Sequence, residues 1–70
     1  MAEVTAPQAA EIIGKTPMTI YRKVEDGLLP ARQEGTGQKK YLYIEVDDLR
    51  AFAAQYGYRL DESLAAQYAK

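Results

Sequence analysis

The sequence predicts a mainly α-helical domain that also contains one two-stranded β-hairpin. Three observations support this prediction. Threonine and proline residues that favour helix starts precede apolar residues at helical spacing, glycines stand where those helices are expected to end, and a stretch in the middle of the chain changes to strand-like alternation. With 70 residues, the chain can form one small domain with a modest core. We expect residues 1–58 to form that domain and residues 59–70 to add a C-terminal helical extension.

The first helix is expected over residues 6–13. Thr5 and Gln8 have the spacing of a capping box, in which two side chains bind backbone N–H groups that have no partner within the helix. Val4 precedes the cap, in position to act as a hydrophobic staple. Gly14 is suited to the left-handed conformation that ends many helices.

A second helix is expected over residues 17–26, directly after the first. Thr16 can cap this helix, a proline occupies its favoured first position, and Gly27 ends it. Only Lys15 separates this cap from the glycine that ends the first helix. Two short helices joined so tightly must pack at a steep angle, which is the geometry of a helix-turn-helix unit.

A β-hairpin is expected next, with strands at residues 31–34 and 39–44. Residues 35–38 include two glycines able to take positive φ and form the tip. Alternation in the second strand places aliphatic side chains on one face and tyrosines on the other. The two sets are Leu42 and Ile44 against Tyr41 and Tyr43.

Two more helices are expected after the hairpin. The first covers residues 45–56 and ends at Gly57, with acids in its first turn, where the helix dipole favours them. Its core-facing stripe is Val46, Leu49, Phe52 and Ala53. The last helix begins at Leu60 or Asp61. Its narrow apolar stripe is Leu60, Leu64 and Tyr68.

The composition argues against catalysis and against metal or cofactor binding. There is no cysteine and no histidine, which excludes disulfides, zinc sites built on these residues and histidine-based triads. The adjacent Asp47 and Asp48 point about 100° apart on a helix, and their position at a helix start is explained by the dipole. Phosphate-binding glycine loops are missing. We expect no catalytic residue, no metal, no cofactor and no small-molecule substrate.

The chain also lacks an apolar run of the ~20 residues that span a bilayer, and its N-terminus does not have the pattern of a signal peptide. We therefore expect a cytoplasmic protein with no membrane partner. The net charge of −1 is unevenly spread: residues 1–14 carry −2, residues 15–40 carry +3 and residues 41–70 carry −2. The positive charge thus gathers in the segment that holds the second helix and the hairpin tip, as in proteins that bind nucleic acid.

The outer side of the second helix is the principal candidate for DNA contact. Ile20 and Val24 lie one turn apart and are expected to face inward, which turns Arg22 and Lys23 outward. A guanidinium can bind a phosphate or a guanine edge in bidentate fashion, and an ammonium suits a phosphate. Residues near the start of such a helix meet base edges, and hydroxyls bind phosphates. The candidates are Thr16, Met18, Thr19, Arg22 and Lys23; the alternative is an ordinary solvated helix surface.

The hairpin tip is the second candidate. Lys39 and Lys40 place two adjacent ammonium groups on a polar, glycine-containing turn that could lie along a phosphate backbone or enter the minor groove. Tyr41 and Tyr43 could add hydroxyl contacts to phosphates. The alternative is a solvated hairpin in which the tyrosines only pack between strands.

The order of these elements resembles the small winged-helix domains of phage and plasmid excisionases, with MerR-type regulators as close relatives. The matching stretches are AAEIIG, KTPMTIYRKVEDGLLPA and YIEVDDLRAF, within residues 4–54. The resemblance implies a winged helix-turn-helix with residues 35–40 as the wing. It also implies that Tyr21 joins Thr16, Thr19 and Arg22 on the DNA side. The implied core is Ala10, Ile13, Ile20, Val24, Leu29, Ile44, Leu49 and Phe52.

The resemblance implies sequence-specific binding of double-stranded DNA, with residues 17–26 in the major groove and the wing on the backbone or in the minor groove. Lys15 and Met18 depart from the family pattern, in which a turn residue is apolar and a helix residue is often basic. We therefore expect one domain to bind with the help of adjacent copies of itself or of a recombinase or polymerase. The role is that of an excisionase-like architectural factor or a small transcriptional regulator. The alternative is a protein-interaction module that uses the acidic faces and residues 59–70.

Overall fold

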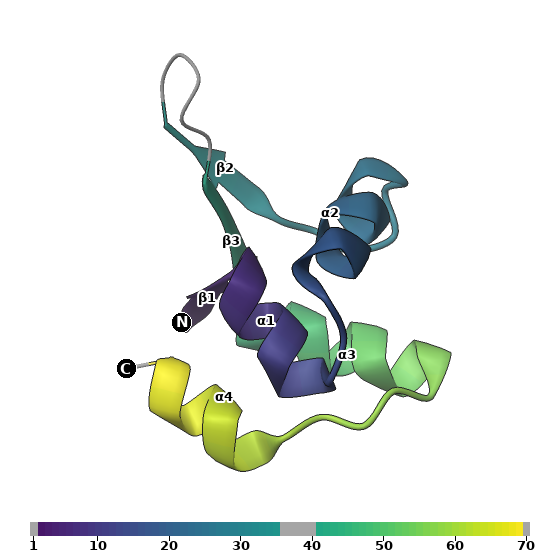
Figure 1. Cartoon of the computed structure of the whole chain (residues 1–70), viewed down its shortest axis with the longest axis vertical. Coiled ribbons are helices and arrows are strands. Elements are labelled where there is room, and N and C mark those ends of the chain that lie inside the picture. The colour runs from purple at the N-terminus through teal and green to yellow at the C-terminus, as the bar shows by residue number, and fades with distance from the viewer. Residues whose placement is uncertain (1, 36–40, 70) are drawn as a thin grey trace.

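The computed structural model describes residues 2–35 and 41–69 (Figure 1). Within these residues the chain forms four helices and three short strands. Their bounds are β1 Glu3–Thr5, α1 Ala6–Ile13, α2 Pro17–Glu25, β2 Arg32–Glu34, β3 Tyr41–Glu45, α3 Val46–Tyr56 and α4 Glu62–Tyr68. None of these helices is long and apolar enough to cross a membrane.

The helix-turn-helix unit forms as predicted from the local sequence. The Gln8 N–H donates to the Thr5 hydroxyl at 3.3 Å, and the Thr5 N–H donates to the Gln8 side chain at 3.0 Å, which completes the capping box. Gly14 ends α1 in the left-handed conformation, with φ of 69°. The prediction for α2 is one residue too long, because the helix ends at Glu25 and Asp26 (φ −76°, ψ −3°) is its C-cap.

The sheet is larger than the sequence predicts. Its three antiparallel strands are ordered β1-β3-β2, and the prediction of a two-stranded hairpin alone is therefore wrong. Val4, expected only as a residue that packs before the first helix, is the centre of β1 and pairs with Ile44 of β3. Both side chains are fully buried. The extra strand gives β3 a backbone partner on its second edge and brings one more aliphatic side chain into the core.

The hairpin pairs Arg32 with Tyr43 and Glu34 with Tyr41. As predicted, the aliphatic side of β3 faces inward, with Ile44 buried. The strand also continues to Glu45, which was expected in the following helix. Because Glu45 has extended backbone and caps α3 without a side-chain bond, the helix begins one residue later. Residues 36–40, which include most of the expected tip, lie outside the described residues.

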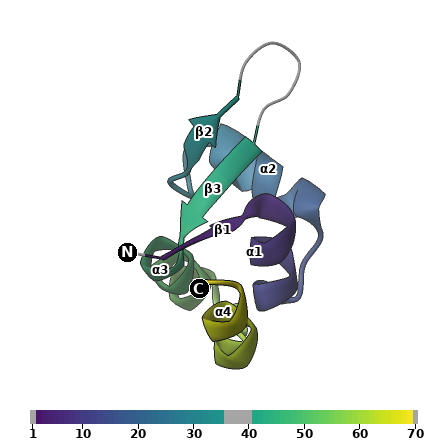
Figure 2. The same ribbon diagram turned by 90° about the vertical axis from the view of Figure 1, so that its left-hand side faces the viewer.

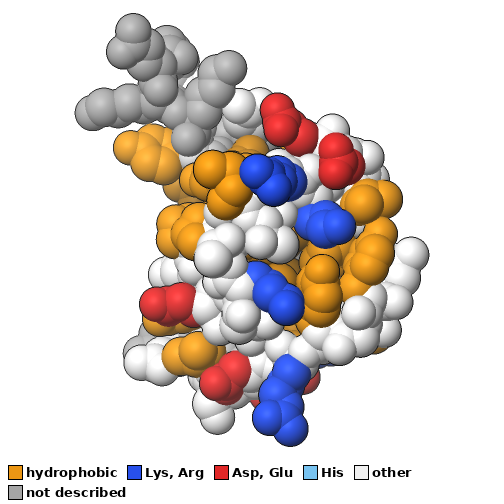
Figure 3. Space-filling view, turned by 45° about the vertical axis from the view of Figure 1, so that its right-hand side comes forward, with side chains coloured by type: hydrophobic (Ala, Val, Ile, Leu, Met, Phe, Trp, Pro, Cys, Tyr) orange, Lys and Arg blue, Asp and Glu red, His pale blue; other side chains and the backbone are white. Residues whose placement is uncertain are grey.

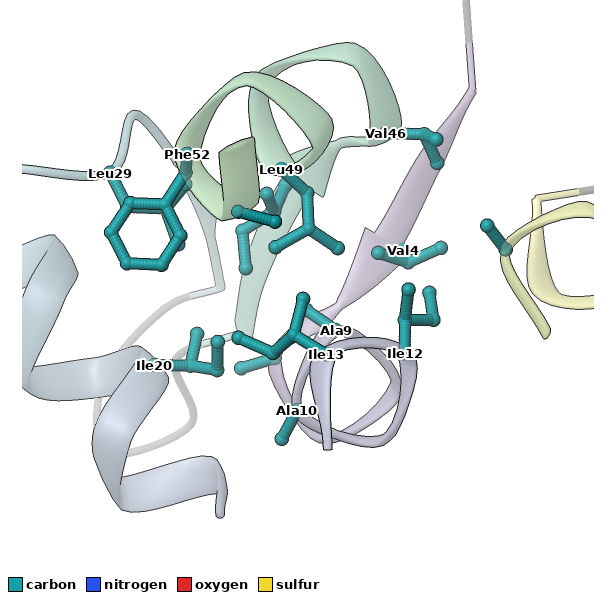
Figure 4. Close-up of a cluster of buried hydrophobic side chains, with 14 residues drawn as sticks. Val4, Ala9, Ala10, Ile12, Ile13, Ile20, Leu29, Val46, Leu49 and Phe52 are labelled. Carbon is teal, nitrogen blue, oxygen red and sulfur yellow. The ribbon is translucent and has the colours of Figure 1, made fainter. Parts of the chain in front are cut away.

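The core lies where α1, α2, α3 and β3 meet (Figure 4). Its largest fully buried side chains are Val4, Ile12, Ile20, Leu29, Ile44 and Leu49. The stripe predicted for the third helix is confirmed, since all four of its members are buried. One expected core residue, Val24 in the last turn of α2, is only half-buried against the core.

Helix α4 packs against α1, at the end of the molecule opposite the hairpin (Figures 1 and 2). The Asp61 N–H donates to the Ile12 carbonyl at 2.8 Å, and Ala65 is buried. The predicted stripe of Leu60, Leu64 and Tyr68 is half-buried against the core of this same chain. The apolar side of the C-terminal helix is therefore largely used within the domain.

Candidate nucleic-acid interface

Helix α2 turns one side to the core and the other to solvent. Ile20 is fully buried, whereas Met18 is 59% exposed. Arg22 lies one turn after Met18 and is also exposed, so the two side chains share the outward face. Among the described residues, Arg22 forms no ion pair with an acid. Its guanidinium is thus available to a ligand.

The start of α2 carries a pair of hydroxyl groups. Thr16 caps the helix by accepting a hydrogen bond from the Thr19 N–H at 3.4 Å, and the two hydroxyl oxygens lie 3.1 Å apart. Thr16 is exposed and Thr19 is half-buried. Because a hydroxyl has one donor and two acceptor positions, this mutual bond leaves the pair able to bind a further polar group.

One flank of α2 faces the hairpin. Tyr21 is 41% exposed and Tyr41 is 53% exposed. Both line a groove of about 340 Å³ between α2, the start of α1 and β3, together with Thr5, Ala6, Pro7 and Leu42. Tyr43 lies elsewhere, under the Arg32 guanidinium at 4.8 Å from the ring centroid. The structure therefore brings Tyr41, but not Tyr43, to the side of the candidate helix.

The opposite flank of α2 faces the end of α3. The Lys23 ammonium lies 5.2 Å from the centroid of the Tyr56 ring, so Lys23 is half-buried rather than fully solvated. Lys15, in the turn before α2, lies over the Tyr58 ring at 4.7 Å. Lys15, Tyr56 and Tyr58 are not among the residues predicted for the site from the sequence. The signal available was the pair of tyrosines around Gly57, a predicted helix end.

Ion pairs remove two of the other arginines from the candidate interface. Arg32 binds Glu3 and Glu34, and Arg50 binds Glu62 and Asp47. Hydrogen bonding and the opposite charge lower the pKa of Glu3 and of Glu62, and raise the pKa of both guanidinium groups. These pairs lie on the sheet and between α3 and α4. Figure 3 shows a face of the molecule on which basic side chains lie among hydrophobic and acidic ones.

Lys39 and Lys40 lie outside the described residues. Asp47 lies in the first turn of α3, as the dipole argument predicts, and binds Arg50 at 2.9 Å. In residues 2–35 and 41–69, no cluster of acidic side chains has the arrangement needed to hold a metal ion.

Comparison with known proteins gives one family. Residues 3–57 match the model of a helix-turn-helix domain, a match that extends from β1 to the glycine after α3 and covers most of the chain. No curated protein and no solved structure matches significantly.

Proposed function

The chain belongs to a helix-turn-helix domain family, whose fold implies binding of double-stranded DNA; on this premise we propose that it reads a specific duplex sequence. In this proposal α2 enters the major groove and the β2–β3 hairpin contacts the backbone or the minor groove. The observation that carries the proposal is the outward face of α2, where Arg22 is exposed and free of ion pairs with the described acids.

In this proposal, different side chains of α2 contact the bases and the phosphates. Met18 and Arg22 lie one turn apart on the outward side of α2 and are the candidates for contacts with base edges. A guanidinium can bind the edge of guanine in bidentate fashion. The hydroxyls of Thr16 and Thr19 at the helix start are suited to phosphates. On the hairpin flank, Tyr21 supplies a further hydroxyl, beside the groove that separates α2 from β3.

In the cell, such a protein acts as an excisionase-like architectural factor or as a small transcriptional regulator. Both roles need a small domain that occupies a defined site, bends or marks the DNA, and places a recombinase or polymerase. Because the α2 face carries only a modest positive charge, we expect cooperative binding, with adjacent copies of this chain or a partner protein on the same DNA. A role as a protein-interaction module is less well supported, because Leu60, Leu64 and Tyr68 pack on the chain's own core.

The proposal is tested by selecting duplexes from a random pool and measuring affinity by fluorescence anisotropy at several salt concentrations. We expect the logarithm of the binding constant to fall linearly with the logarithm of salt concentration, by about 0.9 for each phosphate contacted. Arg22→Ala should weaken binding by roughly 1–3 kcal/mol, about 5- to 150-fold.

The matched control is Arg50→Ala, which removes the same guanidinium from a site between α3 and α4. This variant should bind almost as well as the wild type. The proposal is wrong if no duplex binds at low salt, or if the loss caused by Arg22→Ala is no larger than that caused by the control.

A further inference from the structure

Two lysines and two tyrosines form a ladder on the flank of α2 that faces away from the hairpin. Lys15 lies 4.7 Å from the centroid of Tyr58, Lys23 lies 5.2 Å from that of Tyr56, and the two rings stack with their centroids 6.0 Å apart. The rings in turn pack on buried Phe52, at 4.8 Å and 5.7 Å. The core of the domain thus fixes the platform on which both ammonium groups lie.

The local sequence at the end of α3 produces this platform. Gly57 takes φ of 71° and ends the helix, and the Tyr58 N–H then donates to the Ala53 carbonyl at 2.8 Å. This left-handed turn reverses the chain, so that Tyr58 folds back beside Tyr56. A side chain with a Cβ would be strained at this φ, which explains the glycine between the two tyrosines.

The ladder positions positive charge without neutralising it. Neither Lys15 nor Lys23 forms an ion pair with a described acid, whereas Arg32 and Arg50 each bind two. A cation–π contact uses the face of the ring and leaves the full charge and N–H donors for a second partner. Holding a long side chain in place before binding also reduces the entropy lost when a ligand binds.

The ladder continues a row of donors along α2. Thr19 and Lys23 are one turn apart on the helix, the Thr19 hydroxyl bonds to that of Thr16, and Lys15 comes directly before. Tyr21, on the hairpin flank, is about 200° around the helix from Lys23. The two flanks of α2 therefore carry separate sets of hydrogen-bond donors.

This arrangement matches a helix lying in a DNA groove. The major groove is about 12 Å wide and a helix with its side chains about 10–12 Å, so each flank of an inserted helix comes close to one phosphate backbone. In the docking proposed above, the hairpin and Tyr21 lie toward one of these backbones. We propose that Lys15 and Lys23, held by Tyr58 and Tyr56, contact the phosphates of the other, so that α2 is clamped between both strands. This inference rests on the proposed DNA binding.

The test measures affinity against salt concentration, using a mixed-sequence duplex two helical turns long. Lys15→Gln should weaken binding several-fold at low salt and reduce the salt slope by about 0.9, the value of one lost phosphate contact. The matched control, Gln67→Glu on exposed α4, changes the net charge by the same amount at the end of the molecule away from the hairpin. It should leave the slope unchanged. Tyr58→Leu keeps the charge, and should weaken binding with little change in slope.

The outcomes separate this inference from the function on which it rests. If Arg22→Ala impairs binding while Lys15→Gln behaves like Gln67→Glu, the clamp is wrong and the proposed function stands. If the wild-type protein binds no duplex at low salt, both are wrong. A Tyr58→Leu variant that binds like the wild type overturns the positioning role of the ring. Circular dichroism of each variant confirms that the fold is retained.

Discussion

The Arg32 guanidinium reaches across β3 and donates to both carboxylate oxygens of Glu3, with Nη2–Oε1 at 2.8 Å and Nε–Oε2 at 3.1 Å. This bidentate pair joins the two outer strands of the sheet, while the same guanidinium covers the ring of Tyr43 in the central strand. All three side chains project from the face opposite Val4 and Ile44, as the pairing register requires. The hairpin is thereby attached to the N-terminal strand, beside the helix proposed to bind DNA.

The pair between Glu3 and Arg32 should make stability depend on pH in the acid range. Hydrogen bonding and charge from Arg32 hold the pKa of Glu3 below its ordinary value of 4.5. A carboxyl group with a lowered folded-state pKa stabilises the fold fully above its unfolded-state pKa, and this contribution is lost as the pH falls through the folded-state value. Glu3→Gln should therefore lower Tm slightly at neutral pH. The gap from the wild type should close as the pH falls below 4.5; a gap that is constant with pH would contradict the assignment.

Gly14, in the turn between α1 and α2, should be sensitive to substitution. Its φ is 69°, and a Cβ added there would meet no neighbouring atom, so a substitution is penalised by backbone conformation alone. Gly14→Ala should cost about 1–2 kcal/mol, the penalty for an L-residue in the left-handed region. Gly14→Asn is the control, because asparagine tolerates this region better, and it should cost less. Urea unfolding measures both; equal losses would refute the conformational explanation.

The parts of the fold that were predicted from sequence are those with local causes. The capping box of Thr5 and Gln8 and the left-handed Gly14 delimit α1 within a few residues of the chain, so the predicted and observed bounds agree. Strand β1 was missed because only three residues form it, and its partner Ile44 lies far along the sequence. Three residues are too few to distinguish the alternation of a strand from an irregular segment that leads into a helix.

In the candidate site too, features with local causes were predicted, and contacts between distant segments were not. The outward position of Arg22 follows from helical periodicity and was predicted, whereas Lys23, also expected to face outward, is half-buried. The contacts of Lys15 and Lys23 with tyrosines of α3 depend on how a distant helix end packs beside α2. Nothing in the sequence near either lysine indicates that contact. Tertiary packing also brings Arg32 to Glu3 and Arg50 to Glu62, which are distant in the sequence.

Ile20 should be the main hydrophobic attachment of α2 to the domain. Its side chain is fully buried, whereas Val24, one turn later, is only half-buried. Ile20→Ala should therefore destabilise the domain by about 2–5 kcal/mol, and the milder Ile20→Val by about 0.5–1.5 kcal/mol. A domain of this size has little stability in reserve, so the alanine variant should be largely unfolded near physiological temperature. Thermal unfolding followed by circular dichroism measures both; a loss under 1 kcal/mol for Ile20→Ala would contradict this packing.

Glu25 should oppose DNA binding and its removal should strengthen it. This exposed carboxylate lies in the last turn of α2, one turn after Tyr21 and three residues after Arg22, and forms no ion pair with the described basic side chains. A carboxylate at that position repels phosphates near the proposed interface. Glu25→Gln should raise the affinity for duplex DNA a few-fold at low salt, and the gain should shrink at high salt, where charges are screened.

The control for this variant is Asp48→Asn, which removes one negative charge from the first turn of α3. If a gain in affinity came only from net charge, both variants would show it equally. If α2 lies in the major groove, the gain with Glu25→Gln should clearly exceed that of the control. An unchanged or weaker affinity for Glu25→Gln would place the end of α2 away from DNA and would contradict the proposed docking.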